Sequence, residues 1–236
     1  METLHTVKNA RERLIVALDF PDTGSALDCV RTLADEGATF KVGLQLYIAA
    51  GPEIVRAITA TGAKVFLDLK LHDIPNTVAG AVRAASDLGV AMLTLHLTGG
   101  RRMIEAAVAA SPPSLLLLGV TVLTSSDETT MRETGVETSV EEQTVRLAQL
   151  GAAAGVGGLI ASPREIKTLR ERLGASITII TPGVRPAWAA ANDQKRFATP
   201  GEALRSGSDY LVIGRPITAH ADPRGALQKI LEEIAE

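Results

Sequence analysis

The chain has 236 residues, of which 46% are hydrophobic, and its formal net charge is −3 at pH 7. This length and composition suit one large globular domain, and the slightly acidic balance argues against a nucleic-acid-binding surface. The sequence has no apolar run of about 18 residues, no apolar N-terminal segment and only one cysteine, Cys29, which together predict a cytoplasmic protein without disulfides or membrane contact.

Short apolar runs alternate with helical stretches along the whole chain. The N-terminal half is expected to form a strand at 13–19, a helix at 21–36, a strand at 38–42, a helix that breaks near 51–52 and resumes to 60, a strand at 63–67, a helix from 75, a strand at 91–95 and a helix after 100. The C-terminal half is expected to form a strand at 115–122, a capped helix at 139–154, a strand at 158–161, a helix from 163, a strand at 177–181, a helix at 200–205, a strand at 209–213 and a last helix after 216.

This alternation of strands and helices predicts the fold. Most of the strands are continuously apolar, which is typical of parallel strands buried on both faces. The pattern therefore favours a single (β/α)₈ TIM barrel over residues 1–236. A doubly wound open sheet is the alternative, because periodicity is the only cue.

The stretch 68–77, DLKLHDIPNT, carries the most unusual chemistry of the chain. Alternate residues of a strand point the same way, so Asp68 and Lys70 share one face, and Asp73 follows where the strand should end. Two acids and a lysine at the end of a buried strand are unfavourable unless they pair or take part in function. The alternative interpretation is a structural ion pair at the end of the barrel.

Charged and polar residues follow several other predicted strands. The residues at or just beyond the strand ends are Asp19, Lys41, Asp68, Lys70, His96, Thr124, Arg185 and Arg215. Active sites of these barrels lie at the C-terminal ends of the strands, so the pattern predicts an active site at this rim.

The loops after the seventh and eighth strands are candidates for a phosphate site. Segments 181–186 and 213–216 each combine a glycine with an arginine, and Pro216 is expected to open a helix. Glycine lets backbone N–H groups approach an anion, and the arginine fork matches phosphate oxygens. Turn glycines beside solvated arginines are the alternative. The loop 182–199, which contains Trp188, is long enough to be a lid.

These segments resemble the orotidine 5′-monophosphate decarboxylase family, bacterial type. The stretch 68–77 looks like the family's signature, and it is supported by a set of shorter segments that spread over most of the chain. They are residues 17–19, 40–43, 120–125, 181–186, 193–196 and 213–216. The segment 187–192 is less polar than the family pattern, so no role is carried over to it.

The resemblance implies decarboxylation of orotidine 5′-monophosphate to uridine 5′-monophosphate (UMP) and CO₂, the last step of de novo pyrimidine biosynthesis. Lys70 would be the proton donor, and Lys41, Asp68 and Asp73 would complete a charged array around it. Asp73 and Thr77 would reach into the active site of the other subunit, which implies a homodimer with shared sites.

The resemblance also implies a set of binding residues. Asp19 and Lys41 would contact the ribose and Thr124 the pyrimidine, and the phosphate would be held by Arg185, Gln194, Gly214 and Arg215. No cofactor or metal is implied, and the four histidines are too scattered to suggest a metal site.

Two rival functions remain open at this point. One is a Mg²⁺-dependent sugar-phosphate enzyme with the same barrel and Asp-x-Lys-x-x-Asp core, such as a hexulose-phosphate synthase. The other is a non-catalytic barrel that binds a nucleotide, although binding alone needs no lysine between two acids. His72 lies inside the signature stretch and is expected to have a structural role, whereas His96 is left undecided between packing and function.

Overall fold

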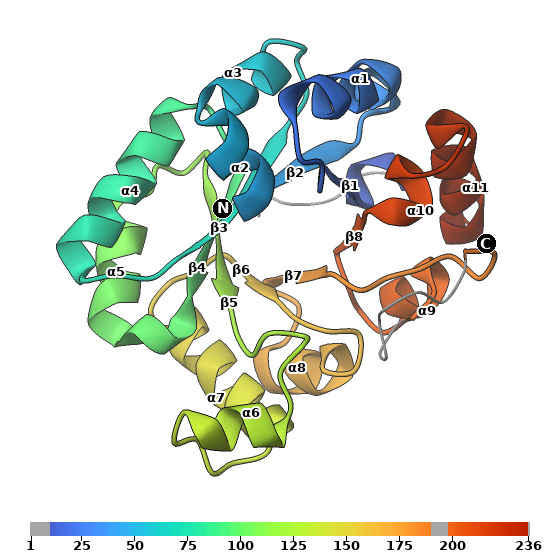
Figure 1. Ribbon diagram of the computed structural model, residues 1–236. Helices are drawn as coiled ribbons and strands as arrows, with labels where there is room; N and C mark the ends of the chain where they lie inside the picture. The colour runs from blue at the N-terminus through green and yellow to red at the C-terminus, as the bar shows by residue number, and fades with distance from the viewer. Residues whose placement is uncertain (1–9, 190–197, 236) are drawn as a thin grey trace.

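A computed structural model describes residues 10–189 and 198–235, and in it eight parallel strands close into a barrel in the order of the chain (Figure 1). The strands are β1 (Leu14–Ala17), β2 (Thr39–Gly43), β3 (Val65–Leu71), β4 (Met92–His96), β5 (Leu116–Val120), β6 (Gly158–Ile160), β7 (Thr178–Thr181) and β8 (Tyr210–Ile213). Each strand pairs with its neighbours in the chain, and β8 pairs with β1. The predicted (β/α)₈ barrel is confirmed.

Helices surround the strands in a ring (Figure 1). They are α1 (Thr23–Leu33), α2 (Leu44–Ala50), α3 (Glu53–Thr59), α4 (Pro75–Asp87), α5 (Gly100–Ala110), α6 (Glu128–Glu133), α7 (Val140–Ala153), α8 (Ile166–Leu173), α9 (Pro200–Arg205), α10 (Arg215–Thr218) and α11 (Pro223–Ala235). Short 3₁₀ turns add η1 (Arg11–Arg13), η2 (Ala34–Glu36) and η3 (Leu97–Gly99). Within residues 10–189 and 198–235, no helix combines the length and apolarity that crossing a bilayer requires.

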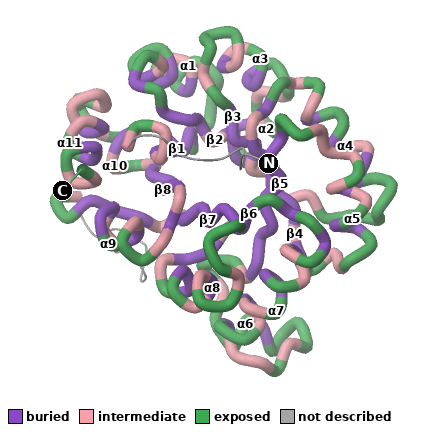
Figure 2. Tube along the Cα trace, turned by 180° about the vertical axis from the view of Figure 1, so that it is seen from behind, coloured by how far each residue is buried: buried purple, intermediate pink, exposed green. Residues whose placement is uncertain are grey.

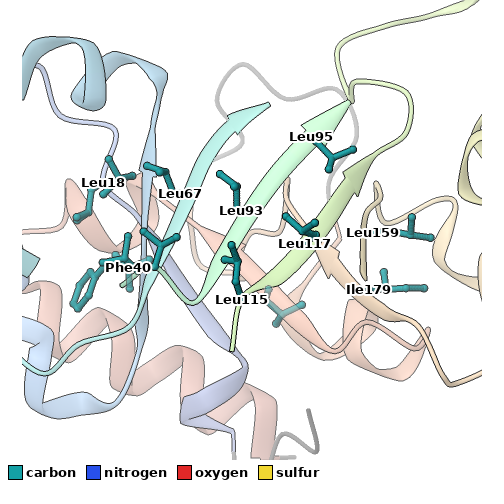
Figure 3. Packing of buried hydrophobic residues seen from close by; sticks show 14 of the residues in the cluster. Leu18, Phe40, Leu67, Leu93, Leu95, Leu115, Leu117, Leu159 and Ile179 are labelled. Carbon is teal, nitrogen blue, oxygen red and sulfur yellow. The ribbon is translucent and has the colours of Figure 1, made fainter. Parts of the chain in front are cut away.

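The core has two layers because successive strand residues point to opposite sides. Inside the barrel, side chains such as Ile15, Phe66 and Leu118 pack against one another. Between strands and helices, a larger cluster includes Phe40 and Leu93 (Figure 3). The strands are accordingly buried along most of their length, whereas the outer turns of the helices are exposed (Figure 2).

The single cysteine lies in this outer layer of the core, and its thiol is unreactive. Cys29 on α1 is 7% exposed, and burial raises the pKa of its thiol to about 11. A thiol is far less nucleophilic than a thiolate, so Cys29 acts as a small apolar core residue.

Local sequence signals explain most of the helix starts. Ser139 and Glu142 form the predicted capping box: Ser139 Oγ accepts from the backbone N–H of Glu142 at 3.2 Å, and the Glu142 carboxylate accepts from the N–H of Ser139 at 3.1 Å. The helix expected from residue 163 starts later, at Ile166, because Ser162 and Glu165 close a separate turn. In that turn the Glu165 carboxylate accepts from the Ser162 N–H at 2.9 Å.

Two further details differ from the sequence-based expectation. The helix α6 was not predicted, because a single apolar side chain, Met131, is buried along it and it has no helical period to recognise. Pro216 lies in the first turn of a helix, but this is the short α10, which starts at Arg215, and the last helix begins separately at Pro223.

Arg170 on α8 holds together the N-terminal ends of β7 and β8. Its guanidinium donates to the carbonyls of Gly207 at 2.8 Å and Ile177 at 2.7 Å, and it pairs with the carboxylate of Asp209. The same carboxylate accepts from the backbone N–H of Ile179 at 2.7 Å. The N-terminal end of such a barrel serves stability rather than catalysis.

We expect Arg170→Ala to lower the free energy of unfolding by about 2–3 kcal/mol, because it removes the charged partner of the Asp209 carboxylate and the donor to two carbonyls. The measurement is the urea midpoint at constant m-value, followed by circular dichroism. Arg172→Ala is the control on the same helix, since Arg172 is exposed and its loss should stay within about 0.5 kcal/mol. Equal effects of the two substitutions would contradict this role.

Candidate active site

A cavity of about 150 Å³ lies at the C-terminal mouth of the barrel. It is lined by Lys41, Phe66, Asp68, Lys70, Val120, Val122, Leu123, Thr124, Ile160, Pro182 and Val212. The charged residues come from β2 and β3, whereas β5, β6 and β8 supply apolar side chains. The cavity therefore has one charged side and a largely apolar remainder, as ligand sites commonly do.

Four charged side chains form a row of alternating sign along this charged side. Lys70 Nζ lies 2.9 Å from both carboxylate oxygens of Asp68. Lys41 Nζ lies 3.8 Å from Asp68 and 3.1 Å from Asp19. The side chains of Lys41 and Asp68 are only 12% and 13% exposed, so these charges interact in a partly water-excluded environment. The structure thus confirms that Asp68 and Lys70 share a face.

The register between neighbouring strands and one glycine determine where these four charged side chains lie. Gly43 pairs with Asp68 between β2 and β3, and Leu18 donates its backbone N–H to the carbonyl of Lys41 at 3.0 Å. A Cβ on Gly43 would lie 3.1 Å from Lys41 Nζ, so glycine leaves room for the ammonium group. The neighbouring strand ends therefore bring Asp19, Lys41 and Asp68 together.

Thr94 on β4 is not among the site residues predicted from the sequence, but it contacts two of them. Its hydroxyl donates to Asp68 Oδ1 at 3.0 Å and accepts from the backbone N–H of Lys70 at 2.9 Å. The sequence does contain a signal, because Thr94 is the polar residue within an apolar strand and lies two positions before His96. Its partners, however, depend on the pairing between β3 and β4.

Asp73 and Thr77 do not join the row. Both side chains are exposed, and Asp73 Oδ1 accepts from the backbone N–H of Ile74 at 2.6 Å. No ion pair links Asp73 to Lys70, two residues whose side chains the structure describes. Their expected place in the site of a second subunit stays a prediction.

A second cavity, of about 360 Å³, contains two of the predicted phosphate ligands, Arg185 and Arg215. It is lined by Arg185, Trp188, Ala189, Arg215, Pro216, Ala219 and His220. Arg185 is 8% exposed, whereas Arg215 is exposed at the first position of α10. Gly214 lies beside the row of charges, since a Cβ there would be 3.7 Å from Asp19 Oδ2.

The loop after β7 is described only in part, and Gln194 lies outside the described residues. The two ends of the loop meet, because Val184 bridges to Ala198 and Arg185 donates its backbone N–H to the carbonyl of Ala198 at 2.9 Å. Trp188 packs against residues near the C-terminus. Its ring centroid lies 5.9 Å from the ring centroid of His220, and Lys229 Nζ lies 5.9 Å from the ring centroid of Trp188.

His72 and His96 lie beside the charged row. Their ring centroids are 5.7 Å apart. Burial lowers the pKa of His96, and the nearby His72 and Lys70 lower it further, against an opposing effect of Asp68. His96 is therefore held in its neutral form at neutral pH. Among the described residues, no group of three or more His, Cys, Asp or Glu side chains is arranged to hold a metal ion.

Comparison with known proteins agrees with this geometry. Residues 12–230 match the model of the orotidine 5′-phosphate decarboxylase / HUMPS family. The chain is 52% identical to an orotidine 5′-phosphate decarboxylase of Syntrophotalea carbinolica over 96% of both chains. It is 51% identical to one of Geobacter sulfurreducens, covering 97% of this chain and 98% of that protein.

A solved structure is similar as well. The crystal structure of orotidine 5′-phosphate decarboxylase from Lactobacillus acidophilus superimposes with a TM-score of 0.85 at 37% identity, over 95% of this chain and 100% of that chain. With a family match over nearly the whole barrel and relatives at about half identity, the chain belongs to the orotidine 5′-phosphate decarboxylase / HUMPS family.

Proposed function

We propose that this chain converts orotidine 5′-monophosphate to UMP and CO₂ without a cofactor, with Lys70 as the proton donor. Relatives at about half identity over nearly the full chain make it a carboxy-lyase, and they support decarboxylation of orotidine 5′-monophosphate in pyrimidine biosynthesis. The observation that carries the mechanism is the pair formed by Lys70 and Asp68, 2.9 Å apart at the mouth of the barrel.

The chemistry explains why such a pair is useful. Loss of CO₂ from C6 leaves an electron pair in the plane of the pyrimidine ring, where the π-system cannot delocalise it. Without an electron sink, the barrier must fall through charges fixed in advance around the developing carbanion. The Lys70 ammonium supplies a positive charge facing C6 and then its proton. Asp68, which is itself paired with Lys41, keeps that ammonium in place.

Asp68 has a second role in this proposal. Its carboxylate is only 13% exposed and lies beside the position that the substrate carboxylate takes next to Lys70. Two carboxylates at close range repel each other, and the repulsion disappears when one of them leaves as neutral CO₂. The arrangement therefore favours the transition state over the bound substrate.

The two cavities support an elongated ligand with a phosphate at one end. Asp19 and Lys41 would hold the ribose, and Thr124 would contact the pyrimidine in the first cavity. Phosphate binding is assigned to the second cavity and the loop after β7, through Arg185, Gln194, Gly214 and Arg215. Segment 182–199 would then close over the phosphate, so that binding energy far from C6 helps to assemble the site.

The proposal includes a cytoplasmic homodimer with shared sites. Asp73 and Thr77 are exposed at the rim, outside the row of charges in their own barrel. Large apolar side chains lie exposed at the same rim: Ile48 is 81%, Ile74 66% and Leu44 52% exposed. Apolar side chains that gather on a surface are typical of a protein–protein interface, and a second copy of the chain would also bring its Asp73 to the site.

The test follows the loss of orotidine 5′-monophosphate absorbance with purified protein in excess chelator. We expect full activity in chelator and formation of UMP. No loss of orotidine 5′-monophosphate, together with a Mg²⁺-dependent reaction of a sugar phosphate, would favour the sugar-phosphate alternative. Binding of UMP without turnover would identify a nucleotide-binding barrel instead.

A further inference from the structure

We propose that Thr94 is a positioning residue, whose hydroxyl sets both the carboxylate of Asp68 and the backbone of Lys70. The inference rests on the proposed function, because it assigns to Thr94 the geometry of that reaction's proton donor. Thr94 is fully buried on β4 and is not among the residues lining the cavity, so it acts through its neighbours rather than on substrate.

The Thr94 hydroxyl is both an acceptor and a donor of hydrogen bonds. The Thr94 hydroxyl accepts a hydrogen bond from the backbone N–H of Lys70 at 2.9 Å, and it donates a hydrogen bond to Asp68 Oδ1 at 3.0 Å. Each of these bonds polarises the hydroxyl in the sense that strengthens the other. The same two residues meet again at their side chains, where Lys70 Nζ contacts the Asp68 carboxylate. Thr94, Asp68 and Lys70 thus form a closed hydrogen-bonded loop.

The backbone of Lys70 needs such support. Its φ is 51°, and it is the only residue other than glycine with a positive φ among the described residues. This conformation costs a lysine roughly 1–2 kcal/mol and persists only where the surroundings enforce it. The pairing between β3 and β4 is interrupted between Leu67 and Leu71. In a regular parallel sheet the backbone N–H of Lys70 would donate to a carbonyl of a neighbouring strand. Here it donates to the Thr94 hydroxyl instead.

Removing the hydroxyl would therefore release both partners at once. The Lys70 N–H would lose its acceptor, and the backbone could relax to an ordinary extended conformation. Because the direction of the Lys70 side chain depends on its φ, such a change would move the ammonium from its present contact with the Asp68 carboxylate. A displacement of about 1 Å at a reacting group can lower the rate on the order of 100-fold.

The experiment compares Thr94→Val, which keeps the shape, with Thr94→Ser, which keeps the hydroxyl. We expect Thr94→Val to lower kcat on the order of 100-fold with KM changed by less than about threefold, and Thr94→Ser to restore most of kcat. Thr144→Val is the matched control. Thr144 is also buried, at 1% exposed, and its hydroxyl has no hydrogen-bond partner within the described part of the chain.

Three results would overturn the proposal: a kcat for Thr94→Val within threefold of wild type, equal losses for the valine and serine variants, or an equal loss in Thr144→Val. If Thr94→Val does not fold, Thr94→Ser is compared with Thr94→Ala, which differs from it by the hydroxyl alone, and equal kcat values then overturn the proposal.

A crystallographic comparison separates this inference from the proposed function. In Thr94→Val, or in Thr94→Ala if the valine variant does not fold, we expect Lys70 to leave its positive φ and its Nζ to move away from Asp68. This outcome supports the positioning role even if the wild-type protein does not decarboxylate orotidine 5′-monophosphate. An unchanged Lys70 in the variant would overturn it.

Discussion

Replacing Lys70 with alanine should abolish decarboxylation and leave the barrel folded. The residue is at the rim, its side chain is 29% exposed, and its loss removes no part of the apolar core. The reaction would lose both the proton donor and the positive charge facing the carbanion. We expect kcat to fall on the order of 10⁴-fold or more, which combines the usual effects of general acid catalysis and of a fixed charge.

The measurement is kcat under single-turnover and steady-state conditions, with circular dichroism to check the fold. Lys70→Gly is a useful second variant, because glycine adopts the positive φ at this position without strain. Lys64→Ala is the matched control, since Lys64 is an exposed lysine just before the start of the same strand and should be neutral. A near-normal kcat in either Lys70 variant would rule out Lys70 as the proton donor.

Mixing Lys70→Ala with Asp73→Ala should restore activity that neither protein has alone. If Asp73 works in the site of the other subunit, one site of the heterodimer carries both defects and the other is intact. Random exchange of equal amounts makes about half of the dimers mixed, each with one good site, so we expect about a quarter of the wild-type rate. The measurement is activity as a function of the heterodimer fraction, determined by native mass spectrometry.

A second mixture controls this experiment. Asp68 and Lys70 touch within one barrel, at 2.9 Å, so mixing Asp68→Ala with Lys70→Ala leaves every site damaged and should restore nothing. Heterodimers that form without recovering activity in the Asp73 mixture would show that Asp73 acts within its own chain.

The sequence predicted those features that depend on regular structure. The barrel follows from the alternation of apolar strands and helices, and the place of Asp68 and Lys70 at the mouth of the barrel follows from their position at the end of a buried strand. The capping box at Ser139 follows from a three-residue spacing. Each of these rules involves residues near one another in the chain, so no knowledge of the tertiary arrangement is needed.

The missed features depend on irregular or non-local geometry. Thr94 bonds to residues 24 and 26 positions away, through a register that breaks between β3 and β4. The positive φ of Lys70 contradicts the usual preference of lysine, so no propensity rule predicts it. Asp73 is a different case, because its predicted role in a neighbouring subunit would leave no trace in the contacts of its own chain.

The position of Trp188 also decides what optical measurements on this protein can report. It is the only tryptophan in the chain, it is 43% exposed, and it lies on the loop after β7 beside His220 and Lys229. Tryptophan emission therefore arises entirely from that loop and its contacts, and none of it comes from the barrel interior. Fluorescence provides a label-free signal for events at the second cavity, whereas unfolding of the barrel itself is better followed by backbone dichroism.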